Sequence, residues 1–372
     1  MANTLPQHIQ VILQKIFNDN IENLAIDEQE GNKSGDGYLG DLVFLTVTNK
    51  KDNVPHNLVI KQCVAGVYPE AFVTATYLNE INFYTKIWPA MTEFQKKHLG
   101  EEDPNFVKHM AKCYYTDTTK GAEKIVLDNL KFKGFELHPK SIPLNFRQYA
   151  SIFKLYAKYH AISFAMRKLE PEKFEEITKD VSNNWERFFI TNPGPVGMTT
   201  AKIKMTFNPT TDQKLAEAFG TYHDNGNDIL IAGMQYDGPY KVFLHADCWS
   251  NNIMFKYNDY LEVDDLRIID FQMCFVGTPV YDLTYSLFSG AGKEALDRTD
   301  DLIDIYYQSL SEALKNYGLD PEKTYPLTAL KEEWKKWNKF GFFISILVLS
   351  AKENAKARMK ELVQYMFDKQ LL

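Results

Sequence analysis

The stretch His245-Ala246-Asp247-Cys248-Trp249-Ser250-Asn251-Asn252 carries the pattern that decides the fold of this chain. It follows the apolar residues 242–244, which predict a short buried strand. Its histidine, aspartate and asparagine occupy the relative positions of the catalytic-loop pattern H-x-D-x-x-x-x-N of kinases. In such a loop the aspartate accepts the proton of the attacking hydroxyl, and the asparagine turns back to bind a metal ion. The stretch therefore predicts Asp247 as a catalytic base and Asn252 as a metal ligand.

A second motif, Ile268-Ile269-Asp270-Phe271-Gln272, places Asp270 eighteen residues after Asn252, at the end of an apolar strand. An aspartate in this position of a kinase binds the metal that bridges the β- and γ-phosphates. Carboxylate and amide oxygens are the hard ligands that Mg²⁺ prefers. A single aspartate at a strand end is more often a turn or cap residue. The order and spacing of the two motifs together favour a catalytic set of Asp247, Asn252 and Asp270, the last two binding Mg²⁺.

The first 130 residues contain a candidate phosphate anchor. Leu58-Val59-Ile60-Lys61 is an apolar strand that ends in lysine, like the V-A-I-K strand whose lysine pairs with the nucleotide phosphates. Glu80, on a helix predicted at residues 70–88, is the expected ion-pair partner of Lys61. Each residue also has a simpler interpretation. The lysine can extend from a sheet edge to water, and Glu80 can be a solvated helix charge.

Further nucleotide contacts are predicted on both sides of that strand. Gly35 and Gly37, just before Tyr38, belong to a glycine-rich run that can bring backbone N–H groups close to phosphates. The run lacks a strict G-x-G-x-x-G pattern. Asp128 and Leu130 lie where the two halves of the chain meet, and their position predicts contact with an adenine ring.

The chain divides into a part rich in strands and a part rich in helices. Strands are predicted from about residue 24 and at 38–48, 57–63, 111–116 and 124–128, with helices at 5–17 and 70–88, the latter ended by Pro89. Later segments are helical, for example 145–169 and 300–316, with short strands at 241–244, 253–257 and 266–269. We predict an α+β, protein-kinase-like bilobal fold, with an N-terminal lobe at 1–129 and a mostly helical C-terminal lobe at 130–372.

Composition excludes several classes of protein. The net charge of −7 argues against a broad nucleic-acid surface, which needs clustered lysine and arginine. The four cysteines have no metal-type spacing, which favours reduced thiols. The most apolar run, residues 340–351, is shorter than the roughly 20 residues of a membrane span. The N-terminal residues lack the pattern of a signal peptide. We expect a cytoplasmic protein without a membrane span; its oligomeric state is not predicted.

The residues after Asp-Phe-Gln argue against a protein kinase. Gly277-Thr278-Pro279-Val280-Tyr281-Asp282-Leu283 begins about five residues after that motif, where a protein kinase has a long activation segment and Ala-Pro-Glu. Two residues keep two interpretations each. Asp282 can brace the catalytic loop or act as a helix N-cap, and His160 can be a core histidine or a substrate contact.

The chain resembles the ecdysteroid kinase-like (CHK kinase-like) family of arthropods, which is related to choline kinases and aminoglycoside phosphotransferases. The resemblance runs from about residue 30 to 290, with Trp249 and the Asp-Phe-Gln motif as its distinguishing features. At the predicted hinge this chain has Asp128-Asn129 where the family more often has Glu-Asp. The residues that carry the resemblance are Gly35–Tyr38, Lys61, Glu80, Phe83-Tyr84, Lys112–Tyr115, Val126–Leu130, His160–Ser163, His245–Phe255, Ile269–Gln272 and Pro279–Leu283.

This resemblance implies a kinase that uses ATP and Mg²⁺ to phosphorylate a hydroxyl of an ecdysteroid or a related lipophilic or xenobiotic alcohol. Asp247 would be the base, Asn252 and Asp270 the metal ligands, and Lys61 the phosphate anchor. One alternative is a kinase for choline, ethanolamine or an aminoglycoside, whose cationic substrates need acidic and aromatic side chains. Another is a pseudokinase that binds nucleotide without turnover, although all four of these residues are present.

Overall fold

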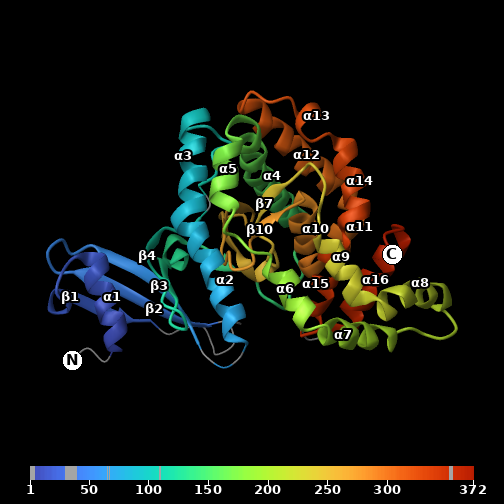
Figure 1. Cartoon of the computed structure of the whole chain (residues 1–372), viewed down its shortest axis with the longest axis horizontal. Coiled ribbons are helices and arrows are strands. Elements are labelled where there is room, and N and C mark those ends of the chain that lie inside the picture. Colours follow the sequence, from blue (N-terminus) through green and yellow to red (C-terminus); the bar gives the residue numbers. More distant parts are fainter. Residues whose placement is uncertain (1–4, 30–39, 65, 67, 109, 352–354) are drawn as a thin grey trace.

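The computed structural model describes residues 5–29, 40–64, 66, 68–108, 110–351 and 355–372. Figure 1 shows an elongated molecule with an antiparallel sheet at one end and a large body of helices filling the rest. The predicted α+β class, with a strand-rich N-terminal region and a mostly helical C-terminal region, is confirmed. Tyr38, Gly35 and Gly37 lie outside the described residues.

Five antiparallel strands in the order β1-β2-β3-β5-β4 form the N-terminal sheet. One face carries a small hydrophobic core in which Ile9, Ile12 and Leu13 of α1 pack against Leu45 and Val126 of the sheet. The strands and this helix are close to those predicted from the sequence: α1 (Gln7–Phe17), β1 (Leu24–Glu28), β2 (Gly40–Asn49), β3 (Pro55–Cys63), β4 (Cys113–Asp117) and β5 (Lys124–Asp128).

The helix predicted at 70–88 does not end at Pro89. It continues from α2 (Glu70–Asn82) through a π-helical turn (Phe83–Ile87) into α3 (Trp88–His98). In that turn the Trp88 N–H bonds the carbonyl of Phe83, five residues back. Pro89 then lies in the first turn of α3, directly after the wider turn. The sequence prediction was wrong because it did not allow for the wider turn.

Buried side chains of α2 and α3 belong to the main hydrophobic core, together with the C-terminal helices, and not to the small core under the sheet. Tyr77, Ile81 and Met91 are among them, and Phe83 of the turn between the two helices joins them. The helix that follows β3 therefore links the sheet to the helical region (Figure 1). The lobe boundary at 129/130 stays a prediction, although β5 ends at Asp128 and a 3₁₀ turn begins at Leu130.

Short strands in the helical region bring the two sequence motifs together. The strands predicted at 253–257 and 266–269 form a hairpin of β8 (Ile253–Tyr257) and β9 (Val263–Ile268), with β6 (Glu136–Leu137) beside β8. The strand before the first motif, β7 (Val242–Leu244), pairs instead with β10 (Phe275–Gly277), which was not predicted. Because β10 follows the second motif, this pairing ties both motifs into one unit.

Helix α10 forms the centre of the helical region, with every residue buried. It packs against α15 and α4, and α12 covers α4 (Figure 1). None of the described helices is both long and apolar enough to cross a membrane. The helices of this region are α4 (Phe146–Leu169), α5 (Pro171–Thr178), α6 (Asn184–Thr191), α7 (Gly194–Lys204), α8 (Gln213–Asp224), α9 (Gly226–Met234), α10 (Pro279–Gly290), α11 (Lys293–Asp297), α12 (Thr299–Asn316), α13 (Pro321–Thr324), α14 (Leu327–Trp337), α15 (Lys339–Leu349) and α16 (Ala355–Asp368).

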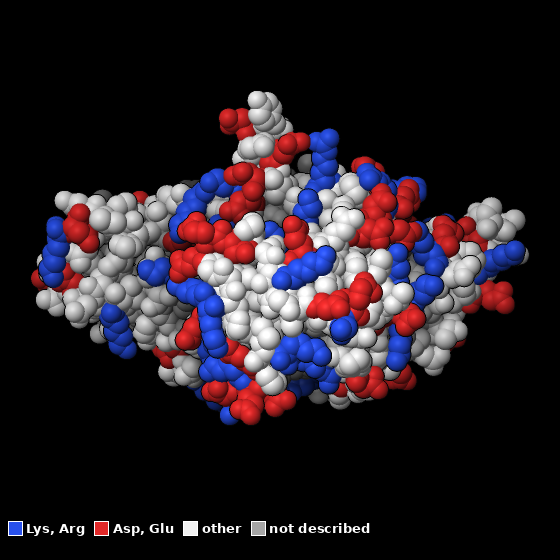
Figure 2. All heavy atoms as spheres, turned by 90° about the horizontal axis from the view of Figure 1, so that it is seen from above, with Lys and Arg blue, Asp and Glu red and all other residues white. Residues whose placement is uncertain are grey.

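The surface carries charges of both signs. On the face shown in Figure 2, lysine and arginine side chains alternate with aspartate and glutamate side chains. A protein that holds nucleic acid through phosphates presents a continuous basic area instead. The described part of this face therefore gives no support for a nucleic-acid partner.

Close contact between α10 and α15 depends on Gly341. A Cβ atom at this position would lie 2.2 Å from Thr284 Oγ1 and 2.6 Å from the Thr284 main-chain carbon. We predict that Gly341→Ala lowers the free energy of unfolding by about 1–3 kcal/mol, because the two helices must separate. Urea denaturation measures the change.

The matched control is Gly197→Ala in α7, where a Cβ atom would meet nothing within 4 Å. This change should raise the free energy of unfolding by up to about 1 kcal/mol, because alanine is the better helix former. Equal effects of the two substitutions would contradict the close packing of α10 on α15.

Candidate active site

Every described site residue predicted from the sequence lines one cavity of about 400 Å³ between the sheet and the helical region. Gly35, Gly37 and Tyr38 lie outside the described residues. A larger surface hollow of about 560 Å³ beside Arg167 and Lys241 contains none of the predicted residues. The predicted residues that share the cavity are Lys61, Glu80, Asp128, Leu130, Asp247, Asn252 and Asp270.

Lys61 lies between two carboxylates. Its Nζ is 2.7 Å from Glu80 Oε2 and 2.8 Å from Asp270 Oδ1. Burial lowers the pKa of Lys61, but the charges of Asp270 and Glu80 outweigh burial and hold the pKa above its usual value. Glu80 is almost completely buried, and burial raises its pKa. The lysine therefore does not extend to water from a sheet edge, and Glu80 is not a solvated helix charge.

The Asp247 carboxylate is held by two neutral donors. Asn252 Nδ2 donates to Asp247 Oδ2 at 2.9 Å and to the Asp247 carbonyl at 2.9 Å, and the Tyr285 hydroxyl donates to Asp247 Oδ1 at 3.0 Å. Burial, followed by the negative charge of Asp270, raises the pKa of Asp247 to about 7. A carboxylate with a pKa near neutrality suits proton transfer at physiological pH.

A buried carboxylate on α10 holds the main chain of the catalytic loop. Asp282 accepts hydrogen bonds from the N–H groups of His245, at 2.9 Å, and Ala246, at 2.8 Å. Ala246 has φ +60° and Asp270 has φ +68°, conformations that non-glycine residues rarely adopt. Such backbone strain persists where the surrounding contacts enforce it, and here Asp282 supplies those contacts for Ala246.

Asp282 and His160 each had two interpretations, and the geometry selects one. The N-cap of α10 is Thr278, whose side chain accepts from the Val280 N–H, so Asp282 braces the loop. His160 is fully buried. Its Nε2 lies 3.2 Å from Asp282 Oδ2 and its Nδ1 lies 3.0 Å from the Tyr306 hydroxyl. His160 is therefore a core histidine that supports Asp282.

Aromatic packing joins the two motifs to the helix that carries Glu80. The ring of Phe271 stacks on Phe83, with a centroid distance of 3.5 Å, and meets His245 edge-on at 4.7 Å. Burial lowers the pKa of His245, which favours a neutral ring. That ring bonds the Ile269 carbonyl through Nε2 at 2.9 Å. Asp247 and Asp270 are thus held on either side of one packed cluster.

The candidate metal ligands Asn252 and Asp270 suit a cation that takes its remaining ligands from phosphate and water. Among the described residues no three His, Cys, Asp or Glu side chains form a metal-binding group. Mg²⁺ is commonly held by one or two carboxylates together with substrate phosphates and water. Asp270 keeps 30% of its side chain exposed, and the Asn252 amide uses its nitrogen for Asp247. One carboxylate oxygen and one amide oxygen thus remain for such an ion.

Comparison with known proteins identifies the family of this chain. The sequence model of the ecdysteroid kinase-like family matches residues 34–319. The chain belongs to this family. No curated protein sequence matches it.

Two solved structures align with nearly the whole chain. Choline kinase from Cryptosporidium parvum Iowa II has a TM-score of 0.51 and 11% identity over 98% of this chain and 97% of its own. The GDP and kanamycin complex of APH(2")-IIia has a TM-score of 0.46 and 11% identity over 98% and 99%. At this identity the choline kinase shows a shared fold and leaves the substrate open.

The cleft of this family member also contains residues that sequence reasoning did not select. Trp185 Nε1 donates to the Ala246 carbonyl at 2.8 Å, which places an indole beside Asp247. The Gln272 amide, oriented to satisfy its neighbours, donates to Asp270 Oδ1 at 3.1 Å and accepts from Lys61 Nζ at 3.2 Å. Tyr285 is the third such residue. Nothing in the helical patterns around Trp185 or Tyr285 distinguishes them from core residues.

Asp282 should stabilise the whole catalytic loop. We predict that Asp282→Asn lowers the free energy of unfolding by about 1.5–3 kcal/mol, because a neutral amide cannot accept from both loop N–H groups as a carboxylate does. Denaturant unfolding gives the change. Asp301→Asn, which breaks an exposed ion pair with Arg298 on α12, is the control and should cost less than about 1 kcal/mol. A loss no larger than that of the control would show that Asp282 does not hold the loop.

Proposed function

We propose that this ecdysteroid kinase-like protein transfers the γ-phosphoryl group of MgATP to the hydroxyl of a neutral, lipophilic alcohol, with Asp247 as the base. Family membership already makes it a small-molecule kinase by class. Beyond this class, we propose ATP as the phosphoryl donor, the residues that act on it, and a neutral lipophilic alcohol as the substrate. The observation that carries it is one cavity in which Lys61, Asp247, Asn252 and Asp270 meet beside an apolar wall.

An apolar slot beside the hinge supports nucleotide binding. The N–H groups of Asp128 and Asn129 donate to the carbonyls of Lys112 and Asn57, so these two are already engaged. We therefore expect the adenine ring to meet the main chain at Leu130. The side chains that would enclose the ring line the cavity from β2, β3, β5, β6, β8 and the segments between strands: Leu42, Phe44, Val59, Ala111, Leu127, Leu137, Met254 and Ile269.

The reaction needs positioning and charge balance more than covalent chemistry. Lys61, oriented by Glu80, would contact the phosphates. Asp247 would take the proton of the acceptor hydroxyl while the hydroxyl oxygen forms the new bond to the γ-phosphorus. The bond between the γ-phosphorus and the oxygen of ADP would break. Asn252 and Asp270 would hold Mg²⁺, which supplies positive charge against the phosphate oxygens.

The proposal of a lipophilic alcohol as substrate rests on a second group of cavity side chains, which are aromatic or aliphatic. Tyr68, Phe72 and Phe188 form an aromatic cluster with centroid distances of 5.2–6.5 Å. These rings belong to α2, α6 and the segment before α2. Trp249, Leu347 and Val348 line the same cavity. An apolar wall of this kind suits a substrate with hydrophobic rings.

Charge in the cavity favours a neutral substrate over a cationic one. The described carboxylates on its wall are Glu80, Asp128, Asp247 and Asp270. Glu80 and Asp270 are paired with Lys61 and Asp128 with Lys133. Aromatic rings can hold a cation. Among the described residues, however, the aromatic part of the wall contains no carboxylate that would add to this attraction. We also propose a cytoplasmic location, where ATP is available and the four free cysteines stay reduced.

Two substitutions separate chemistry from binding. Asp247→Asn should retain MgATP binding while kcat falls by roughly two to four orders of magnitude, because the proton acceptor is lost. Asp270→Ala should weaken nucleotide binding only when Mg²⁺ is present. Calorimetric titration with ATP, with and without Mg²⁺, and an ADP-release assay measure these effects. Undiminished turnover of Asp247→Asn would rule out its role as the base.

A substrate panel tests the acceptor class. Purified protein with MgATP is offered ecdysteroids, plant phenolics, glucosides, choline, ethanolamine and an aminoglycoside, and mass spectrometry detects phosphorylated products. We expect a product among the neutral lipophilic alcohols and none with Asp247→Asn. A product from the cationic compounds alone would favour the choline- or aminoglycoside-type alternative. MgATP binding without any product would favour the pseudokinase.

A further inference from the structure

One face of α10 contacts both the main chain of the catalytic loop and the side chain of Asp247. Asp282 accepts from the main chain of the loop, and Tyr285, three residues later, donates to the side chain of Asp247 at 3.0 Å. Residues three apart lie on the same face of a helix. The same rigid element that sets the loop backbone therefore also contacts the proposed base.

The carboxylate of Asp247 has one donor on each oxygen. Asn252 Nδ2 bonds Oδ2 and the Tyr285 hydroxyl bonds Oδ1. Two donors on opposite oxygens fix the rotation of the carboxylate plane, which a single donor leaves free. Each oxygen keeps a second acceptor site for the proton of an incoming hydroxyl.

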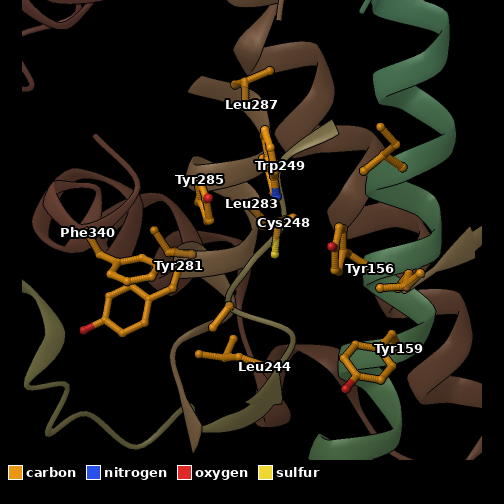
Figure 3. Close-up of a cluster of buried hydrophobic side chains, with 14 of the residues drawn as sticks. Tyr156, Tyr159, Leu244, Cys248, Trp249, Tyr281, Leu283, Tyr285, Leu287 and Phe340 are labelled. Atoms are coloured by element: carbon orange, nitrogen blue, oxygen red, sulfur yellow. The ribbon is translucent and has the colours of Figure 1, made fainter. Parts of the chain in front are cut away.

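Packing makes Tyr285 a fixed donor. The side chain is buried, and its ring meets Phe340 of α15 edge-on at a centroid distance of 6.2 Å. Figure 3 shows Tyr285, Tyr281 and Phe340 on the side of the core away from Tyr156 and Tyr159 of α4. A buried tyrosine has few rotamers available, so its hydroxyl stays in place at little entropic cost.

We propose that Tyr285 is a positioning residue of this site. Its hydroxyl holds the Asp247 carboxylate in the orientation in which it can take the proton of the substrate alcohol. The proposal rests on the kinase reaction proposed above. Asp270 places a second negative charge near Asp247, and repulsion would turn an unrestrained carboxylate away. A neutral phenol holds it without forming an ion pair with the base.

The test compares two substitutions on the same helix. Tyr285→Phe removes the bonding hydroxyl and keeps the ring. Tyr281→Phe is the matched control, because the Tyr281 hydroxyl is buried without a hydrogen-bond partner among the described residues, and its ring packs on Phe340 at 4.8 Å. Transfer from MgATP to water, and to any alcohol phosphorylated in the panel above, gives kcat and KM. Crystals of each variant with MgADP show the Asp247 carboxylate.

For Tyr285→Phe we expect kcat to fall roughly tenfold to a hundredfold, the effect of losing a hydrogen bond to a charged group or of misplacing a reacting atom. The KM for MgATP should stay unchanged, and the crystals should show a rotated Asp247 carboxylate. Tyr281→Phe should match the wild type in every measurement.

A Tyr285→Phe variant with wild-type kcat, or with an unrotated Asp247, would overturn the positioning role. A rise in the KM for MgATP at unchanged kcat would overturn it too, since it would place Tyr285 in nucleotide binding. A wild-type protein that transfers phosphate to neither water nor any alcohol contradicts the kinase reaction instead. In that case the orientation of Asp247 in the two crystals still decides whether Tyr285 holds the carboxylate.

Discussion

The Lys61 ammonium, buried between the carboxylates of Glu80 and Asp270, joins three separate parts of the chain. Lys61 is on β3, Glu80 on α2, and Asp270 directly after β9. A buried charge is tolerated only where opposite charges and hydrogen bonds compensate its desolvation. The three elements must therefore be in place together. Assembly of the end of the cleft that is proposed to bind phosphate is in this way coupled to folding of the protein.

Two further anchors keep α2 and the catalytic loop in this arrangement. The Asn79 side chain on α2 donates to the carbonyls of Ser182 and Cys274 and accepts from the Ser182 N–H. Asp282, on the buried helix α10, holds the loop and its left-handed residue Ala246. Asn79 thus fixes the helix that carries Glu80, and Asp282 fixes the loop that carries Asp247.

The cleft combines a charged centre with apolar walls. Around Lys61 and Asp247 the polar groups are paired or hydrogen-bonded to one another, which keeps their orientation fixed before substrates bind. Preorganised groups of this kind need little rearrangement during phosphoryl transfer. The aromatic and aliphatic side chains that line it would provide surface for the adenine ring and the hydrophobic alcohol proposed above.

The sequence determined the fold class and the positions of most strands, and it predicted the residues proposed to carry the chemistry. Motif spacing was enough to propose Asp247, Asn252 and Asp270, because kinase chemistry needs a base and metal ligands at fixed distances along a strand–loop–strand segment. The pairing of Lys61 with Glu80 was predicted in the same way. By itself the sequence also left Asp282 and His160 with two roles each, since a single residue in an apolar helix does not reveal its partner.

Only the tertiary structure decided those roles and added Tyr285 and Trp185. Tyr285 lies 38 residues after Asp247, and Trp185 lies 61 residues before Ala246. Contacts over such separations arise from helix packing, and local patterns do not record them. The same holds for the pairing of β7 with β10 and for the π-helical turn that carries the chain past Pro89. Local spacing identifies the reacting groups, whereas packing of distant segments sets their orientation.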